Sequence, residues 1–276
     1  MPKIDAHQHF WHFDPERDAW ITDDMAAIQR DFLPADLEPL LQEHGFEGCA
    51  AVQASQSEAE TNFLLELAAQ HSFIKGVVGW VDLRADNVEE RLAHYRRFEK
   101  LKGFRHVLQG EDDRALMLRP EFRRGLAALH AHGFTYDVLI LPDQLGYAAE
   151  LAEAFPTQPF VLDHLAKPLI KSGEIEPWRR DFTALAAREN VWCKVSGLVT
   201  EADRQHWQPA DFRPYLDAAF EAFGARRLMF GSDWPVCNVA GGYGRAHALV
   251  ADYLAAFSAD EQRQFWGDNA ISFYDL

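Results

Sequence analysis

The chain has 276 residues, of which 48% are hydrophobic, and a formal net charge of −16. A chain of this length buries a large core, either as two small domains or as one large α/β barrel. An acidic surface repels phosphate backbones and anionic membranes, so we expect neither a nucleic acid nor a membrane as partner. No window approaches the roughly 18 apolar residues of a membrane span, and the first residues lack the pattern of a signal peptide.

The three cysteines, Cys49, Cys193 and Cys237, form no CxxC pair and cannot all be paired within one chain. We expect them to be reduced thiols that fill small spaces in the core. Free thiols are typical of a reducing compartment, so the sequence predicts a cytoplasmic protein. It gives no indication of the oligomeric state.

Eight short apolar runs rich in β-branched residues recur along the chain, at residues 3–6, 48–53, 74–81, 101–107, 134–141, 159–163, 190–196 and 227–232. Between them lie segments with apolar residues three and four apart, such as 60–71, 119–133 and 210–224. Pro120 near a helix start, and Gly133 and Gly224 just past helix ends, are the expected punctuation. The alternation predicts a parallel (β/α)8 barrel, with an open doubly wound sheet as the weaker alternative.

No low-complexity linker divides this pattern, so we expect a single barrel domain over residues 1–276. A further helix is expected near residues 259–266, and the tail from residue 269 should pack back on the barrel.

The first predicted strand leads into the segment "DAHQHFW", which begins at Asp5 and places histidines at positions 7 and 9. The interrupted spacing differs from the histidine run of an expression tag. Residues two apart in a strand lie on one face, so Asp5, His7 and His9 would point the same way. The two imidazoles can then converge on one small target, although two histidines near a terminus also occur by chance.

A catalytic barrel carries its chemistry at the C-terminal ends of its strands. The polar residues expected there, besides His7 and His9, are Arg105, His106, Asp137, Asp163, His164 and Asp233. A carboxylate that follows an apolar strand is costly to bury without a partner, which favours a functional role for Asp233. The alternatives are a core histidine for His164, a structural ion pair for Arg105 and a loop cap for Asp233.

Two or three imidazoles and one carboxylate suit a single zinc or manganese ion and leave a place for water. The candidate metal ligands are His7, His9, His164 and Asp233. Whether such an ion is needed for activity is a separate question from whether it binds.

Longer strings carry a more specific signal than the histidine pair. The segments "DAHQHFW", "WITDDM", "VVGWVDL", "GFRHVLQ", "FVLDHLAKP", "KVSGLVTEAD" and "MFGSDWPVCN" occur in this order. Together they resemble the sugar-lactone hydrolases of the amidohydrolase superfamily, specifically the L-fuconolactonase and L-rhamnonolactonase group. The resemblance implies a (β/α)8 barrel, hydrolysis of an aldonolactone, and a site built from His7, His9, His164 and Asp233.

One departure from the superfamily affects the metal. Many metal-dependent members bring a lysine or glutamate from the fourth strand, whereas here that strand ends in Arg105 and His106. We therefore expect at most one metal ion, and the lactonase branch that the chain resembles includes enzymes that work without an added metal.

Opening a lactone needs an activated water, stabilisation of the carbonyl oxygen and a proton for the leaving alkoxide. We expect Asp233 to be the general base, with His9 and His164 as further catalytic residues that polarise the carbonyl. The predicted substrate-binding residues are Arg105, His106, Gln53, Asp137 and Trp234, with Trp234 stacking on the sugar ring. The alternatives are a metal-dependent decarboxylase on a related barrel and an inactive binding relative.

The predicted substrate is a neutral polyhydroxy ring. Arg105 is the one arginine expected at a strand end, and binding a dicarboxylate would require more arginines there. The family strings favour L-fuconolactone over L-rhamnonolactone.

Overall fold

The computed structural model describes residues 2–276, in which eight parallel strands follow chain order around a barrel. The strands are β1 (Ile4–Gln8), β2 (Gly48–Val52), β3 (Ile74–Gly79), β4 (Leu101–His106), β5 (Thr135–Val138), β6 (Phe160–Leu162), β7 (Val191–Val195) and β8 (Leu228–Phe230). A parallel bridge between Gln8 and Trp234 joins the two ends of the sheet. The predicted (β/α)8 barrel is confirmed, and the open-sheet alternative is wrong.

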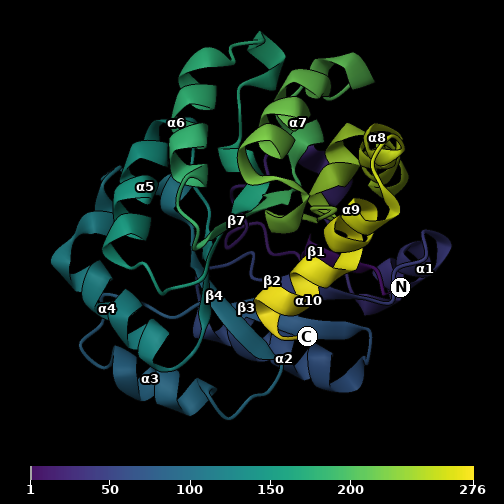
Figure 1. The fold of residues 1–276 in the computed structure, drawn as a ribbon. Helices are drawn as coiled ribbons and strands as arrows, with labels where there is room; N and C mark the ends of the chain where they lie inside the picture. The colour runs from purple at the N-terminus through teal and green to yellow at the C-terminus, as the bar shows by residue number, and fades with distance from the viewer. Residues whose placement is uncertain (1) are drawn as a thin grey trace.

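Helices surround the barrel in the ribbon view of Figure 1. They are α1 (Pro34–Glu43), α2 (Glu58–Gln70), α3 (Val88–Tyr95), α4 (Pro120–Ala131), α5 (Leu145–Ala154), α6 (Glu176–Ala186), α7 (Pro209–Phe223), α8 (Tyr243–Leu254), α9 (Ala259–Arg263) and α10 (Asn269–Tyr274). Pro120 begins α4, and Gly224, with a φ of 64°, ends α7, as the punctuation predicted.

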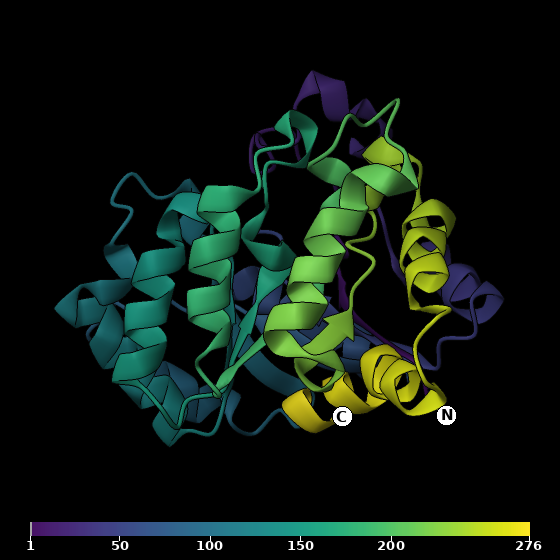
Figure 2. The same cartoon turned by 45° about the horizontal axis from the view of Figure 1, so that its top comes forward.

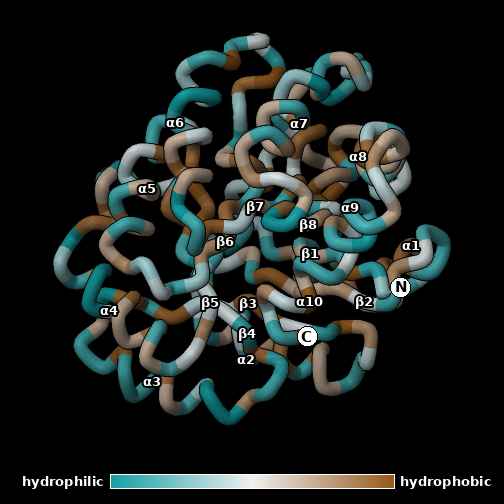
Figure 3. Tube along the Cα trace, in the orientation of Figure 1, coloured by the Kyte–Doolittle hydropathy of each residue, from teal (hydrophilic) through white to brown (hydrophobic). Residues whose placement is uncertain are grey.

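The strands are buried on both faces, so they read as continuous apolar runs (Figure 3). Their outward side chains pack under the helices, and their inward side chains form a second, smaller core. That inner core includes Ala270, Phe273 and Tyr274 of α10, which crosses the barrel end shown facing the reader in Figure 1 and at the bottom of Figure 2. The prediction that the tail packs back on the barrel is therefore confirmed.

Several strands differ in length from their predicted ranges. β1 continues to Gln8, beyond the predicted end at residue 6. β5 ends at Val138, although Leu139 and Ile140 are also buried. Apolar composition marks burial, and these two residues are buried outside the hydrogen-bonded ladder, so composition alone made the predicted strand too long.

The three cysteines are free and buried, as predicted. Burial raises the pKa of all three thiols. Among residues 2–276, no helix combines the length and the apolar character needed to cross a bilayer. The cytoplasmic location and the absence of a nucleic-acid partner stay predictions.

His247 on α8 lies in an aromatic cluster away from the strand ends that carry the polar residues. Its ring centroid is 4.7 Å from that of His44 and 5.1 Å from that of Trp266. Its Nε2 is buried and has no hydrogen-bond partner among the described residues. Burial, with smaller contributions from His44 and Lys3, lowers the pKa of His247 to about 4 from the usual 6.5.

We expect this histidine to make folding sensitive to acid. Between pH 6.5 and 4, His247 is protonated in the unfolded chain and still neutral in the folded protein. The free energy of unfolding therefore decreases as the pH falls through this window. His247→Phe keeps an aromatic ring and removes the proton site. Urea unfolding should therefore show the variant gaining stability relative to the natural chain between pH 7.5 and pH 5. A pH-independent difference, equal to that of the exposed control His130→Phe, would contradict this prediction.

Candidate active site

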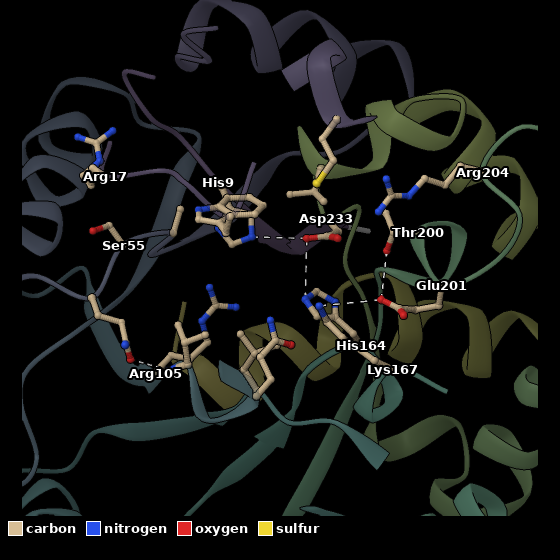
Figure 4. A pocket seen from close by; sticks show the side chains of 18 residues that line it. His9, Arg17, Ser55, Arg105, His164, Lys167, Thr200, Glu201, Arg204 and Asp233 are labelled. Atoms are coloured by element: carbon tan, nitrogen blue, oxygen red, sulfur yellow. Dashed lines mark hydrogen bonds and ion pairs between the residues drawn. The ribbon is translucent and has the colours of Figure 1, made fainter. Parts of the chain in front are cut away.

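His9, His164 and Asp233 face one another at the C-terminal mouth of the barrel (Figure 4), and His7, the fourth predicted ligand, lies beside them. The Nε2 atoms of His7 and His9 are 3.2 Å apart. Oδ1 of Asp233 lies 3.5 Å from Nε2 of His9 and 3.9 Å from Nε2 of both His7 and His164. Barrel closure produces this arrangement, because the backbone N–H of Asp233 donates to the carbonyl of His7 at 2.9 Å.

His164 begins an unusual turn after β6. Residues His164, Leu165, Ala166 and Lys167 all have left-handed φ angles, between 52° and 57°, although none is glycine. Each such residue costs about 1–2 kcal/mol, a strain that persists where the surrounding structure enforces it. Leu165 and Ala166 are fully buried, and the indole N–H of Trp178 donates to the Leu165 carbonyl at 2.7 Å. The turn brings both of its ends, His164 and Lys167, to the same cavity.

Hydrogen bonds restrict the proton positions on the two strand-one histidines. Nδ1 of His9 lies 2.7 Å from the Val52 carbonyl, which can only accept, so the lone pair of His9 is on Nε2 and faces the site. Nδ1 of His7 lies 3.1 Å from the Lys194 ammonium and 3.2 Å from a carboxylate oxygen of Asp163. His7 can therefore donate from Nδ1 to Asp163, or accept there from Lys194 and donate from Nε2 to His9.

Charge states follow from burial and from these neighbours. Burial lowers the pKa of His164 to about 4 and that of His7 well below its usual value. Burial alone would raise the pKa of Asp233, but His164, His9 and His7 together outweigh it and hold that pKa below the usual range. At neutral pH His7 and His164 are therefore neutral, and Asp233 is a carboxylate.

This donor set fits one divalent metal ion. His7, His164 and Asp233 each offer a ligand atom, and the three atoms lie within 4.8 Å of one another. Neutral imidazole nitrogens and a carboxylate are the protonation states that zinc requires, and the lone pair of His9 faces the same point. The Arg105 guanidinium, 3.4 Å from Nε2 of His7, supplies a positive charge that disfavours a second ion.

A fully buried charge network lies in the barrel beneath the site. The Lys194 ammonium is 2.5 Å from a carboxylate oxygen of Asp137 and 3.0 Å from one of Asp163. Asp163 also accepts from Arg105 at 3.0 Å, and the Tyr274 hydroxyl donates to Asp137 at 2.8 Å. The tail helix α10 is thus connected to the base of the site through side-chain hydrogen bonds.

Above the site is a cavity of about 530 Å³. Of the predicted residues, it is lined by His9, Arg105, His164 and Asp233; further lining residues include Arg17, Trp20, Ser55, Gln109, Lys167, Thr200, Glu201 and Arg204. The second group was not predicted from the sequence, because the prediction considered only the ends of strands and most of these residues lie in loops. Three of them, Trp20, Lys167 and Glu201, lie within the family strings "WITDDM", "FVLDHLAKP" and "KVSGLVTEAD". Membership of these strings could have indicated a functional role for them.

Two predicted substrate-binding residues lie outside the cavity because of strand geometry. Successive side chains of β4 point to opposite faces, so Arg105 points inward and His106 outward. His106 hydrogen-bonds Glu111 at 2.6 Å and packs against Phe122. Asp137 points inward but lies in the buried network below the site. The structure does not support direct substrate contact for His106 or Asp137.

Gln53 and Trp234 are also placed away from the cavity. The Gln53 side chain is fully buried and its amide donates to the Arg105 backbone carbonyl at 3.0 Å, while the Gln53 backbone carbonyl accepts from the Arg105 guanidinium. Gln53 therefore positions Arg105. The Trp234 ring is 2% exposed and packs against Phe32 at 5.3 Å. Trp20, 43% exposed at the cavity, is the aromatic ring available for stacking on a sugar.

Arg105 is the one cavity arginine on a strand, as predicted, but loops bring more basic groups to the pocket than we expected. Arg17, Lys167 and Arg204 line the cavity as well. Three of these four cations have a hydrogen-bonded carboxylate: Arg17 with Asp18, Arg105 with Asp163, and Arg204 with Asp24. Carboxylates of the protein thus neutralise most of the positive charge in the pocket, so a neutral substrate is still favoured.

The chain is similar over nearly its full length to known proteins. Residues 4–276 match the amidohydrolase family. The chain is 42% identical to the L-fucono-1,5-lactonase of Burkholderia multivorans, over 99% of this chain and 96% of that protein, and 38% identical to the L-fucono-1,5-lactonase of Burkholderia ambifaria at the same coverage. A crystal structure of an amidohydrolase from Burkholderia multivorans with bound zinc has a TM-score of 0.96 at 42% identity, covering all of both chains.

Proposed function

Because the chain belongs to the amidohydrolase family, we propose that it hydrolyses a sugar lactone to its aldonic acid, with L-fucono-1,5-lactone as the first candidate substrate. One observation carries the proposal: the Asp233 carboxylate lies within 3.9 Å of three imidazoles at the base of a charge-balanced cavity of about 530 Å³. A cavity of this size suits a small ring.

The first chemical step uses Asp233. As a carboxylate at neutral pH it accepts a proton from a water molecule, whose oxygen attacks the lactone carbonyl carbon. The same proton then passes to the ring oxygen as the carbon–oxygen bond breaks, which leaves a hydroxyl group and a carboxylic acid. The acid then releases its own proton to solvent as the aldonate forms. Asp233 thus acts first as base and then as acid, and water is the sole co-reactant.

Arg105 and the histidines stabilise the negative charge that develops on the substrate during the reaction. The Arg105 guanidinium lies beside Nε2 of His7 and is held by Asp163 and the Gln53 carbonyl. A fixed cation at this position stabilises the oxyanion that develops on the carbonyl, without reorganisation during the reaction. Trp20 offers an aromatic face to the C–H side of the sugar ring.

One divalent ion would be held by His7, His164 and Asp233, with His9 beside them. Zinc is our first choice for this ion and manganese the second. When bound, such an ion supplies Lewis-acid polarisation of a carbonyl oxygen. The Arg105 guanidinium lies beside these residues, 3.4 Å from Nε2 of His7, so an ester, which needs less activation than an amide, can be opened with its help.

We therefore expect chelation to reduce lactonase activity only partly. The test is to measure kcat and KM before and after dialysis against a chelator, with the metal content determined in both samples. We expect at most one ion per chain before dialysis and measurable turnover after it. Complete loss of activity, restored by zinc or manganese alone, would show that the carbonyl is activated by metal.

The proposed function is tested by a panel of aldonolactones followed by acid release. A pyrone dicarboxylate, an amide and a dihydroxybenzoate serve as comparison substrates, with carbon dioxide measured as well. We expect turnover of neutral six-carbon lactones, with L-fucono-1,5-lactone among the best. Preference for the dicarboxylate, or carbon dioxide release without lactone turnover, would overturn the proposal in favour of another hydrolase or a decarboxylase.

A further inference from the structure

Lys167 and Glu201 form a charged pair on the cavity wall that the mechanism does not use. The Lys167 ammonium is 3.9 Å from Oε1 of Glu201, and both side chains are about four-fifths buried, at 22% and 23% exposed. Figure 4 shows the pair beside His164, facing the same space as Asp233. The distance is short enough for attraction and too long for a hydrogen bond.

The three other cavity cations differ in this respect. Arg17, Arg105 and Arg204 each lie 2.7–3.0 Å from their carboxylate partners. Among the described residues, Glu201 Oε1 has one weak further contact, from the Thr200 hydroxyl at 3.5 Å. Donor capacity on Lys167 and acceptor capacity on Glu201 are therefore left over at the cavity surface.

The pair is not required to hold its two loops together. The backbone N–H of Lys171 donates to the Glu201 carbonyl at 3.0 Å, which already joins the segment after β6 to the segment after β7. The left-handed turn fixes Lys167 in place at a cost in backbone strain. A strained backbone that presents a partly unsatisfied pair to a cavity indicates a role in ligand binding.

We propose that Lys167 and Glu201 together bind one hydroxyl group of the substrate ring, with the ammonium donating to the hydroxyl oxygen and the carboxylate accepting the hydroxyl proton. A hydroxyl is both donor and acceptor, and its oxygen can lie about 2.8 Å from each member of a pair spaced in this way. A substrate carboxylate would meet Glu201 with like charge. The pair thus selects a neutral hydroxyl, and this inference rests on the proposed lactonase function.

The experiment compares lactones that differ by one hydroxyl. The best lactone substrate and its monodeoxy analogues are each assayed with the natural chain, Lys167→Met and Glu201→Gln. Lys171→Met and Glu174→Gln, both exposed residues nearby, are the matched controls. Thermal melting establishes that each variant folds, and Glu201→Gln, which is nearly isosteric, decides the question if Lys167→Met does not fold.

We expect one monodeoxy analogue to lose about 10²-fold or more in kcat/KM with the natural chain, since a site built for a hydroxyl rejects analogues that lack it. Lys167→Met and Glu201→Gln should lose a similar factor on the parent lactone and less than about threefold on that analogue, while both controls match the natural chain. Equal losses on every lactone would show a structural role and overturn the inference, as would unchanged activity. If the natural chain hydrolyses no lactone, the proposed function itself fails, and the inference fails with it.

Discussion

Replacing Asp233 by asparagine is expected to lower kcat by about 10² to 10⁴ with the fold intact. The substitution keeps the size of the side chain and removes the proton acceptor that faces the attacking water. The backbone N–H of residue 233, which closes the barrel against the His7 carbonyl, is unchanged. Asparagine also tolerates the left-handed φ of 56° at this position better than most residues do.

Steady-state kinetics with a chelator present measures this effect, because Asp233 is also a candidate metal ligand and metal loss would otherwise contribute. The exposed Asp252→Asn variant is the control for loss of a carboxylate. A strongly lowered pKa makes Asp233 a weak base, so the competing assignment of the base is a histidine, His164 or His9. Near-normal turnover of Asp233→Asn would transfer the role to one of these.

Replacing Lys194 by methionine is expected to reduce the free energy of unfolding by about 3–5 kcal/mol. Lys194 is fully buried, and its ammonium lies between the carboxylates of Asp137 and Asp163. Methionine has a similar volume and no charge, so the variant leaves two buried carboxylates facing each other with less compensation. Burial already raises the pKa of Asp137 with Lys194 in place.

Urea unfolding of Lys194→Met against the exposed control Lys171→Met gives this difference. The double variant Lys194→Met/Asp137→Asn should recover part of the lost stability, because it removes one of the two uncompensated carboxylates. A loss below about 1 kcal/mol, with no recovery in the double variant, would mean that water reaches the network and screens it.

The sequence by itself determined the barrel and four of the residues that meet at its mouth. The spacing of apolar residues gave the strands and helices, because a strand buried on both faces must be apolar throughout and a helix only along one side. The two-residue spacing of His7 and His9 predicted a shared face, and the strand-end rule added His164 and Asp233. Asp5, predicted to point the same way, is instead outside the site, where its carboxylate accepts from backbone N–H groups. These inferences succeed because parallel strands in one barrel must end at the same mouth.

Side-chain depth within the barrel was decided only by the tertiary structure. Arg105 and His106 are adjacent polar residues in one strand, and the strand period allows only one of them to point inward. Which one does so depends on the register of β4 against its neighbours, which pairs Arg105 with Asp137. Asp137 points inward too, but one layer lower, where it neutralises Lys194.

The cavity walls were also beyond the sequence, for a different reason. Trp20 and Glu201 belong to loops without periodicity, and Lys167 reaches the cavity through four consecutive left-handed residues, which local preference alone disfavours without glycine. Buried contacts of Leu165 and Ala166, together with the Trp178 hydrogen bond, compensate for that backbone strain. Local sequence therefore determined which helices and strands form. The pocket that would bind the substrate depends on long-range packing, which overrides the local preference for backbone conformation.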